Sequence, residues 1–147
     1  MKRIIGLTLV CFTLLSDPAF AATKSIGKDN VNIRSGPSLN DKIIYEAPLG
    51  YPIKIEKEQG KWVFFRDWEN DAGWVYKSFV SEIPTAVVLV KVANVRNSPG
   101  TAHKVVAKVH RGEIYKIVGK KGDWIKLGYY SGGEEIGWIR RDLLFGD

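Results

Sequence analysis

The sequence predicts an all-β protein made of two tandem copies of one small barrel. No segment shows a sustained apolar period of 3.6 residues, whereas short runs rich in Val, Ile, Tyr and Trp alternate with clusters of Gly, Pro, Asn and Asp. In addition, the run Val31–Pro37 (VNIRSGP) returns as Ala93–Pro99 (ANVRNSP) 62 residues later. A repeat of this kind indicates that one structural unit occurs twice.

The repeat extends well beyond these two runs. Trp62 falls on Trp124 at the same spacing of 62, and Trp74 falls on Trp138 at a spacing of 64. The second copy therefore has a two-residue insertion between these tryptophans, and a hairpin tip is where an insertion is best tolerated. We expect the two copies at residues 23–83 and 84–147, with a joint so short that they touch.

Turn signals divide each copy into about five short strands, which suit a small closed barrel. The expected strands of the first copy are 30–34, 42–47, 52–58, 61–68 and 72–77. Those of the second copy are 87–96, 104–109, 113–118, 123–130 and 136–140.

Residues 1–22 have the features of a secretory signal peptide. Two basic residues precede the apolar run Ile4–Leu15, and small residues then suit cleavage after Ala21 or Ala22. The apolar run is too short to span a bilayer. We therefore expect an exported protein, periplasmic or secreted, with no transmembrane segment in the mature chain. Cleavage would also remove Cys11, the only cysteine, so the mature chain could form no disulfide.

Positive charge is concentrated in the second copy. Residues 84–147 contain 11 Lys and Arg against 6 Asp and Glu, a net of +5, whereas residues 28–83 contain 8 against 9, a net of −1. One hypothesis is electrostatic association with an anionic envelope polymer, and the alternative is that the charge only maintains solubility. The basic residues of this hypothesis are Lys116, Lys120, Lys121, Arg140 and Arg141.

Comparison of the copies predicts which side chains face the core. Val63 and Phe65 stay apolar in the second copy, whereas Phe64 becomes Lys126. Because successive side chains on a strand point to opposite faces, 63 and 65 should face inward and Phe64 outward.

The same comparison assigns the strand near residue 45. Ile43, Tyr45 and Ala47 all have apolar counterparts in the second copy, whereas Glu46 matches Lys108. The alternation therefore predicts that the three apolar side chains face the core.

The order Asn-Ile-Arg-Ser-Gly-Pro, an apolar strand, Leu-Gly, Gly-Lys-Trp-Val and Gly-Trp-Val-Tyr resembles the bacterial SH3 (SH3b) family, and both copies carry this pattern. The resemblance covers almost all of the mature chain. It implies two tandem SH3-like barrels. It also implies an exported binding module, because family members are often attached to cell-wall enzymes and several bind the peptide stems or bridges of peptidoglycan.

Aromatic side chains are in excess on one hairpin of the first copy. The residues expected on its non-core face are Trp62, Phe64, Trp68, Trp74 and Tyr76. The second copy keeps both of the paired tryptophans but replaces Phe64 and Tyr76 by Lys126 and Arg140. An apolar patch of this kind costs solubility unless it is covered. Either the second copy covers it, or it is a groove in which a peptide or sugar stacks.

The motif residues Arg34 and Asn32 have a structural and a functional interpretation. Arg34 could grip a carboxylate of a ligand through two parallel hydrogen bonds, or it could hold its own loop in place. Asn32 is a poor strand former, and a hydrogen bond to the following turn would explain its position. Gly73, directly before Trp74, indicates a bulge or a close approach of two backbones.

The inventory for catalysis is poor, so we expect no enzyme activity. His103 and His110 occur only in the second copy, and no serine lies in a recognisable nucleophile turn. No Cys, His or Asp cluster has the spacing of a metal site, and no glycine-rich loop leads into a helix. We expect no cofactor and no nucleic-acid partner.

The sequence thus predicts a non-catalytic binding module of the cell envelope that recognises peptidoglycan or a cell-wall-processing protein. The expected ligand-binding residues are Arg34, Phe64, Trp68, Trp74 and Tyr76. Two alternatives stay open. One is a periplasmic protein–protein interaction adaptor, and the other is the electrostatic binder of an anionic polymer.

Overall fold

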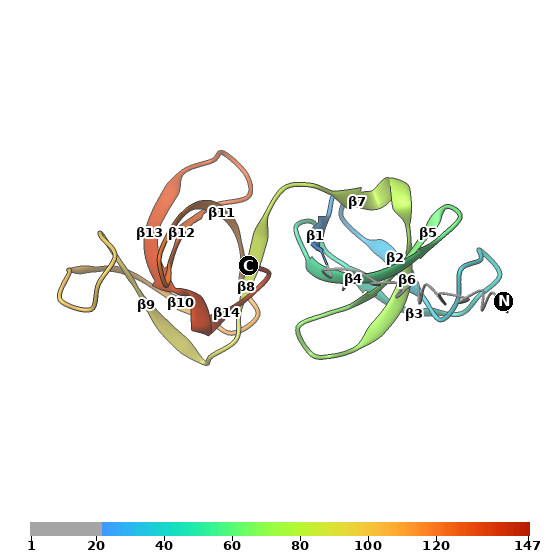
Figure 1. The fold of residues 1–147 in the computed structure, drawn as a ribbon, viewed down its shortest axis with the longest axis horizontal. Coiled ribbons are helices and arrows are strands. Elements are labelled where there is room, and N and C mark those ends of the chain that lie inside the picture. Colours follow the sequence, from blue (N-terminus) through green and yellow to red (C-terminus); the bar gives the residue numbers. More distant parts are fainter. Residues whose placement is uncertain (1–21) are drawn as a thin grey trace, which may run out of the picture.

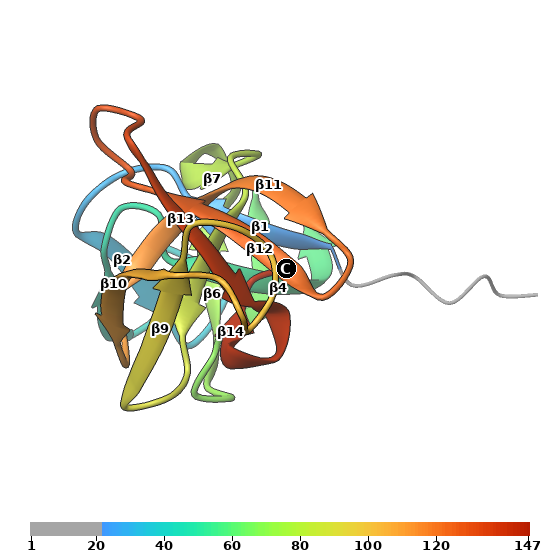
Figure 2. The ribbon, with the colours of Figure 1, turned by 90° about the vertical axis from the view of Figure 1, so that its left-hand side faces the viewer.

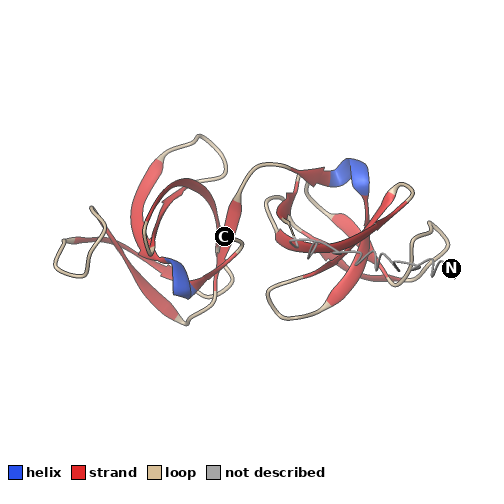
Figure 3. Cartoon of the chain, viewed as in Figure 1, coloured by secondary structure: helices blue, strands red, loops and turns tan. Residues whose placement is uncertain are grey.

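The computed structural model describes residues 22–147 and consists of two β-sheets, one for each copy, side by side along the chain (Figures 1 and 3). The first sheet contains β1 (Thr23–Ile26), β2 (Val31–Arg34), β3 (Ile43–Ala47), β4 (Pro52–Gln59), β5 (Trp62–Arg66), β6 (Ala72–Tyr76) and β7 (Val80–Ser81). The second contains β8 (Thr85–Val88), β9 (Val92–Arg96), β10 (Val105–His110), β11 (Ile114–Lys121), β12 (Trp124–Gly128), β13 (Glu135–Arg140) and β14 (Leu144–Phe145). One 3₁₀ turn precedes the last strand of each copy: η1 (Lys77–Phe79) and η2 (Arg141–Leu143).

The two sheets have the same topology. The first runs in the order β3-β2-β6-β5-β4-β1-β7 and the second in the order β10-β9-β13-β12-β11-β8-β14, with antiparallel neighbours. In Figure 2 the second copy faces the viewer, and its strands curve around a common interior. The predicted all-β fold of two tandem small barrels is confirmed.

Each sheet has seven strands, two more than the five expected. In the first copy the additional strands are β1 and β7, and β1 pairs with both β4 and β7. The strand β7 has only two residues and follows a 3₁₀ turn, so its sequence carries no alternation from which it could be predicted. In the second copy the single strand expected at 87–96 is divided into β8 and β9.

Each copy has its own hydrophobic core. In the first copy Val63, Phe65 and Val75 are buried, while Phe64 lies on the opposite face of β5 and is half-buried. The inward and outward assignments made from the repeat are therefore confirmed for this hairpin. The core of the first copy comprises Ile26, Val31, Ile33, Ala47, Ile53, Val63, Phe65 and Val75.

One core assignment on β3 is wrong. Ala47 is buried and Tyr45 packs against the core, but Ile43 is 44% exposed. The pairing of β2 with β3 shifts by one residue between Ile33 and Arg34, which leaves Ile44 as an extra residue on β3. Such a bulge breaks the alternation of side chains, so the residue beyond it no longer faces the core.

The hairpin of β5 and β6, and its counterpart of β12 and β13, show two features that the sequence predicts: the place of the insertion and the close approach at Gly73. The longer loop of the second copy lies between β12 and β13, at residues 129–134, as the insertion predicts. A Cβ atom added to Gly73 would lie 2.4 Å from Cγ2 of Ile33. Gly73 therefore permits β2 and β6 to approach closely, as the sequence predicts.

The two copies are in contact. The hydroxyl of Thr85, at the start of β8, donates a 2.6 Å hydrogen bond to the carbonyl of Gly50 in the first copy. The guanidinium of Arg111 lies 4.9 Å from the centre of the Trp68 ring. The expectation that the short joint brings the copies together is confirmed.

The expected signal peptide and Cys11 lie outside the described residues except for Ala22. Within residues 22–147, no helix is both long and apolar enough to cross a bilayer.

Candidate functional site

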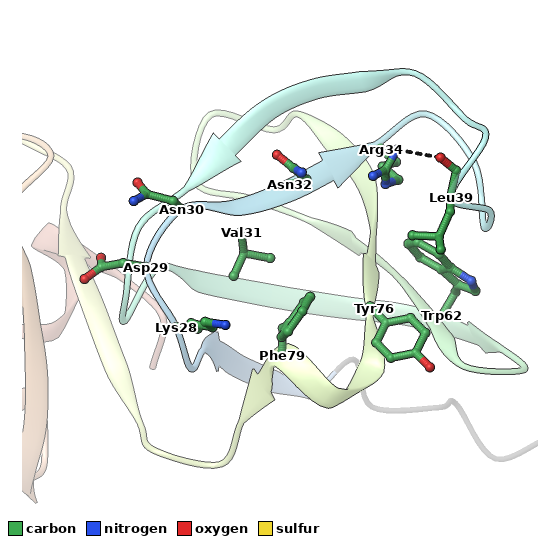
Figure 4. A pocket seen from close by; sticks show the side chains of 10 residues that line it. All are labelled: Lys28, Asp29, Asn30, Val31, Asn32, Arg34, Leu39, Trp62, Tyr76 and Phe79. Carbon is green, nitrogen blue, oxygen red and sulfur yellow. Dashed lines mark hydrogen bonds between the residues drawn. The ribbon is translucent and has the colours of Figure 1, made fainter.

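A groove of about 420 Å³ lies on the surface of the first copy (Figure 4). It is formed by the segment that leads into β2, by β2 itself, and by the residues at which β5 begins and β6 and η1 end. The residues that line it are Lys28, Asp29, Asn30, Val31, Asn32, Arg34, Leu39, Trp62, Tyr76 and Phe79. We call this hollow the first groove.

One side of the first groove is aromatic. Trp62 and Tyr76 are opposite each other across β5 and β6, and their rings meet edge to face with centroids 5.4 Å apart. The ring of Phe79 follows, 6.0 Å from that of Tyr76. Three rings in a row, each in contact with the next, offer the rigid apolar surface on which peptides and sugars pack.

The other side of the first groove is polar. Asn32 and Arg34 alternate with buried residues on β2, so their side chains lie on the groove side (Figure 4). Arg34 Nη1 donates to the carbonyl oxygens of Leu39 at 3.0 Å and Asp41 at 2.8 Å. Arg34 thus holds the loop after β2, and this contact places the 74% exposed side chain of Leu39 at the rim.

Asp29 and Lys28 complete the first groove at the start of β2. Asp29 accepts a 3.0 Å hydrogen bond from the backbone N–H of Leu49, which fixes the segment in place. The ammonium group of Lys28 lies 5.7 Å from the centre of the Phe79 ring. The groove therefore presents both a cation and an anion beside its aromatic side.

Of the five residues expected to bind a ligand, the structure brings Arg34 and Tyr76 together in the first groove. Phe64 and Trp74 form a separate pair on the same face, with ring centroids 5.2 Å apart. Lys57 Nζ lies 5.1 Å and 5.2 Å from these two rings, and Trp74 is only 7% exposed. This pair lies beneath a lysine and does not line the first groove.

Trp68 lies elsewhere. It comes after β5 has ended and packs against the second copy, where the guanidinium of Arg111 lies over its ring. The alternative that the second copy covers the aromatic surplus therefore holds for Trp68 alone. On the hairpin face, Phe64 and Trp74 pair with each other, and Tyr76 lines the first groove.

Sequence reasoning assigned no ligand role to Trp62 or Phe79. Trp62 is kept in both copies, and Phe79 lies in η1, beyond the last strand expected for the first copy. The signal that was available is the position of Asn32 and Arg34 at the same place in both copies. A polar pair that both copies keep on one face of a strand indicates an exposed binding surface as well as a turn.

The acidic residue Asp67 anchors the loop between β5 and β6. It is buried, and Oδ2 accepts hydrogen bonds from the phenols of Tyr45 at 2.8 Å and Tyr51 at 2.9 Å. Burial, and then the hydrogen bond to the Asp67 carboxylate, raises the pKa of both tyrosines well above the usual value. Both phenols therefore stay neutral donors, which makes this a structural network.

The two histidines of the second copy lie in polar surroundings at its surface. Nδ1 of His110 is 3.3 Å from Oε1 of Glu113. Burial alone would raise the pKa of Glu113, but hydrogen bonds from Tyr115 and His110 outweigh it and lower the pKa. Over residues 22–147, no three His, Cys, Asp or Glu side chains are grouped so as to hold a metal ion.

Among proteins of known sequence, the chain is 26% identical to a Bacillus subtilis (strain 168) protein named as an N-acetylmuramoyl-L-alanine amidase, YrvJ, over 97% of this chain and 30% of that protein. It is also 32% identical over 53 residues to a Staphylococcus epidermidis protein named as a cell wall amidase, LytH, which covers 36% of this chain and 18% of that protein. The chain thus spans a third or less of the length of these relatives.

Solved structures show a low overall likeness. NlpC2 from Trichomonas vaginalis aligns with a TM-score of 0.37 at 20% identity, over 85% of this chain and 48% of that one. An NlpC/P60 family protein from Bacillus cereus aligns with a TM-score of 0.39 at 13% identity, over 84% of this chain and 56% of that one.

Two family models match, both described as the bacterial SH3 domain. The first covers residues 27–82 and the second residues 91–145, so each model spans most of one sheet. Both matches agree with the repeat and with the common topology of the two copies. The chain belongs to the bacterial SH3 domain family and contains two such domains in tandem.

Proposed function

We propose that this chain is an exported, non-catalytic binding protein of the cell envelope, and that the first groove recognises a peptide of peptidoglycan or of a cell-wall-processing protein. The observation that carries the proposal is the contact of Trp62, Tyr76 and Phe79 along one side of a 420 Å³ groove. Aromatic anchors beside a few fixed polar groups are typical of ligand sites.

The geometry favours an extended ligand. The aromatic side runs from Trp62 to Phe79, and β2 lies along the opposite side with Asn32 facing the groove (Figure 4). A peptide backbone could stack on the rings and exchange hydrogen bonds with the Asn32 amide. Arg34 takes part through the loop that it holds, since its Nη1 is bonded to two loop carbonyls.

The relatives support an envelope setting. Two of them are named as amidases, one of the cell wall, and the chain matches 30% and 18% of their lengths. The proposal takes from them only the cell-wall context, because so partial a match does not carry over an amidase activity. Residues 1–22 serve as the export signal in this proposal.

The structure gives less support to the alternative of diffuse binding to an anionic polymer. Asp147 pairs with both Lys120 and Arg141. Asp142 accepts two hydrogen bonds from Arg140. Acidic partners therefore neutralise much of the basic cluster on which that alternative depends. An adaptor that docks on an envelope protein uses the same first groove and is distinguished by experiment.

The test is co-sedimentation of the mature chain with purified peptidoglycan sacculi at low and moderate salt. Tyr76→Ala is compared with Phe64→Ala, which removes a ring from the same hairpin face but outside the first groove. We expect salt-tolerant binding that Tyr76→Ala weakens by about tenfold or more, the effect of losing an aromatic anchor. Phe64→Ala should bind as the unchanged protein does.

Near-ultraviolet circular dichroism checks that both variants stay folded. Equal losses in the two variants would contradict the assignment of the first groove. Absence of sedimentation at either salt would remove the peptidoglycan hypothesis and leave the adaptor.

A further inference from the structure

The second copy carries a groove at the place equivalent to the first one. It has a volume of about 260 Å³. Its lining residues are Val92, Ala93, Asn94, Arg96, Thr101, Trp124, Arg140 and Leu143. We call it the second groove. Asn94, Arg96 and Trp124 are the repeat counterparts of Asn32, Arg34 and Trp62, so the same strands build both grooves.

The aromatic side is where the two grooves differ. In the first groove Trp62 pairs across the hairpin with Tyr76, whereas in the second Trp124 pairs with Arg140. Leu143 of η2 takes the place of Phe79 of η1. The second groove thus keeps one ring and gains a cation where the first has a phenol.

Arg140 is held in position and still has donors to offer. Its Nε and Nη2 donate to the two carboxylate oxygens of Asp142, at 3.0 Å and 2.9 Å. A guanidinium has five N–H donors, so three are not used by these two bonds. The side chain is 51% exposed and lies beside the groove that it lines.

Arg96 adds a second guanidinium to the same lining. Its Nη1 donates to the carbonyl oxygen of His103 at 2.8 Å, as Arg34 does to its own loop. The eight lining residues include two arginines and no acidic side chain. The first groove is lined by Lys28 and Arg34 together with the acidic Asp29. Asp142 balances one of the two arginine charges, so the second groove keeps a net positive charge and free N–H donors for a carboxylate.

We infer that the second groove is a separate binding site for the carboxylate of a short peptide. A planar carboxylate matches the fork of N–H donors on a guanidinium, and the N–H groups of Arg140 that Asp142 does not use leave such a fork between Nη1 and Nη2. Trp124 provides the apolar wall for the residue that bears the carboxylate, and Asn94 offers an amide to its backbone. The inference does not depend on the first groove binding anything.

The test is an NMR titration of isotope-labelled chain 22–147 with two probes, N-acetyl-Gly-Gly-Ala as the free acid and as the C-terminal amide. The indole N–H signals of Trp124 and Trp62 report on the two grooves separately. We expect the acid to shift the Trp124 signal with saturation and the amide to bind at least about tenfold more weakly. High salt should weaken the binding of the acid.

Reciprocal variants use the match between the copies as a control. Arg140→Tyr places in the second groove the residue found at the equivalent position of the first, and it should abolish the preference for the acid. Tyr76→Arg should confer a response to the acid on the Trp62 signal. Arg140 is exposed and Tyr76 is half-buried, and the dispersion of the amide spectrum reports whether the fold is kept.

Three results would overturn the inference. They are an unshifted Trp124 signal at millimolar acid, equal binding of the acid and the amide, and an acid preference that survives in Arg140→Tyr. None of these results depends on sedimentation with sacculi, so a failure here and a failure of the first groove are distinguishable.

Discussion

Four hydrogen bonds converge on the buried carboxylate of Asp67, directly after β5. Besides the two phenols, the backbone N–H groups of Glu69 and Asp71 donate to Oδ1, at 3.0 Å and 2.9 Å. The second copy rebuilds the contact from another position, because the Tyr115 phenol donates to Glu113 Oε2 at 2.7 Å. A phenol paired with a carboxylate is thus present in both copies, although the residues that supply it have changed.

Replacement of Asp67 by Asn should destabilise the first copy. An amide has one acceptor oxygen, so it cannot accept from both the phenols and the loop N–H groups, and its NH₂ would face donors. We expect the free energy of unfolding to fall by ~2–3 kcal/mol, the cost of buried donors left unsatisfied. Urea unfolding measures this. The exposed Asp71→Asn in the same loop is the control, and an equal loss there would contradict the role of the Asp67 carboxylate.

The tyrosines next to these carboxylates should make the protein sensitive to alkali. Burial, followed by the Asp67 hydrogen bond, raises the pKa of Tyr45 and Tyr51 in the folded state. The unfolded chain loses these protons near pH 10, so it binds fewer protons than the folded chain above that pH. The free energy of unfolding should be constant below about pH 9 and fall as the pH rises through about 10.

Urea unfolding across this range, with the phenolate absorbance followed in parallel, checks the prediction. Tyr51→Phe should start from a lower stability but lose less of it on going to high pH. A slope that is the same in the variant and the unchanged protein would show that Tyr51 does not contribute.

At the level of the strands, Gly73 controls how closely β6 approaches β2. An added Cβ would lie 2.4 Å from Ile33 Cγ2, and Ile33 is fully buried. Gly73→Ala should therefore lower the free energy of unfolding by ~1–3 kcal/mol, the usual cost of overpacking a core. Thermal and urea unfolding measure the loss.

Ala72→Gly is the matched control, because it changes the neighbouring position of β6 in the opposite sense and creates no clash. It should cost less than about 1 kcal/mol. A Gly73→Ala variant as stable as the unchanged protein would mean that β2 and β6 separate without cost.

The strands also show what the sequence could and could not predict. Aligning the copies assigned Val63, Phe65 and Phe64 to the correct faces, because alternation is strict where pairing is regular. It failed at Ile43, where a bulge shifts the register by one residue. A bulge depends on the pairing of two strands, and the sequence of either strand alone does not show it.

The candidate site was only partly predictable for a related reason. Tyr76 and Arg34 were both expected to bind a ligand, Tyr76 from the aromatic excess of the first copy and Arg34 from the repeated motif. Trp68 was placed with them, yet the chain leaves β5 before residue 68 and turns this ring toward Arg111. Phe79 lies on a 3₁₀ turn of three residues, too short to carry a periodic pattern. In loops and short turns, tertiary contacts determine where side chains lie, so the local sequence pattern does not predict their positions.

Over the whole molecule, the contacts between the copies determine how the two grooves are held relative to each other. The Thr85 hydroxyl bonds to Gly50, and Arg111 covers Trp68. We expect these contacts, next to a joint of few residues, to restrict the motion of one domain relative to the other. The chain should then present both grooves on one rigid body.

NMR relaxation tests this arrangement through the rotational correlation time of each copy. We expect the two copies of the unchanged chain to tumble together, with equal correlation times. The double variant Thr85→Val/Arg111→Ala removes the hydrogen bond and the cation over Trp68, so the correlation times should become shorter and unequal. Lys57→Ala also removes a cation from an aromatic pair, but far from the contact between the copies, and should leave them unchanged. Independent tumbling of the unchanged chain would show that the contact does not hold the copies together in solution.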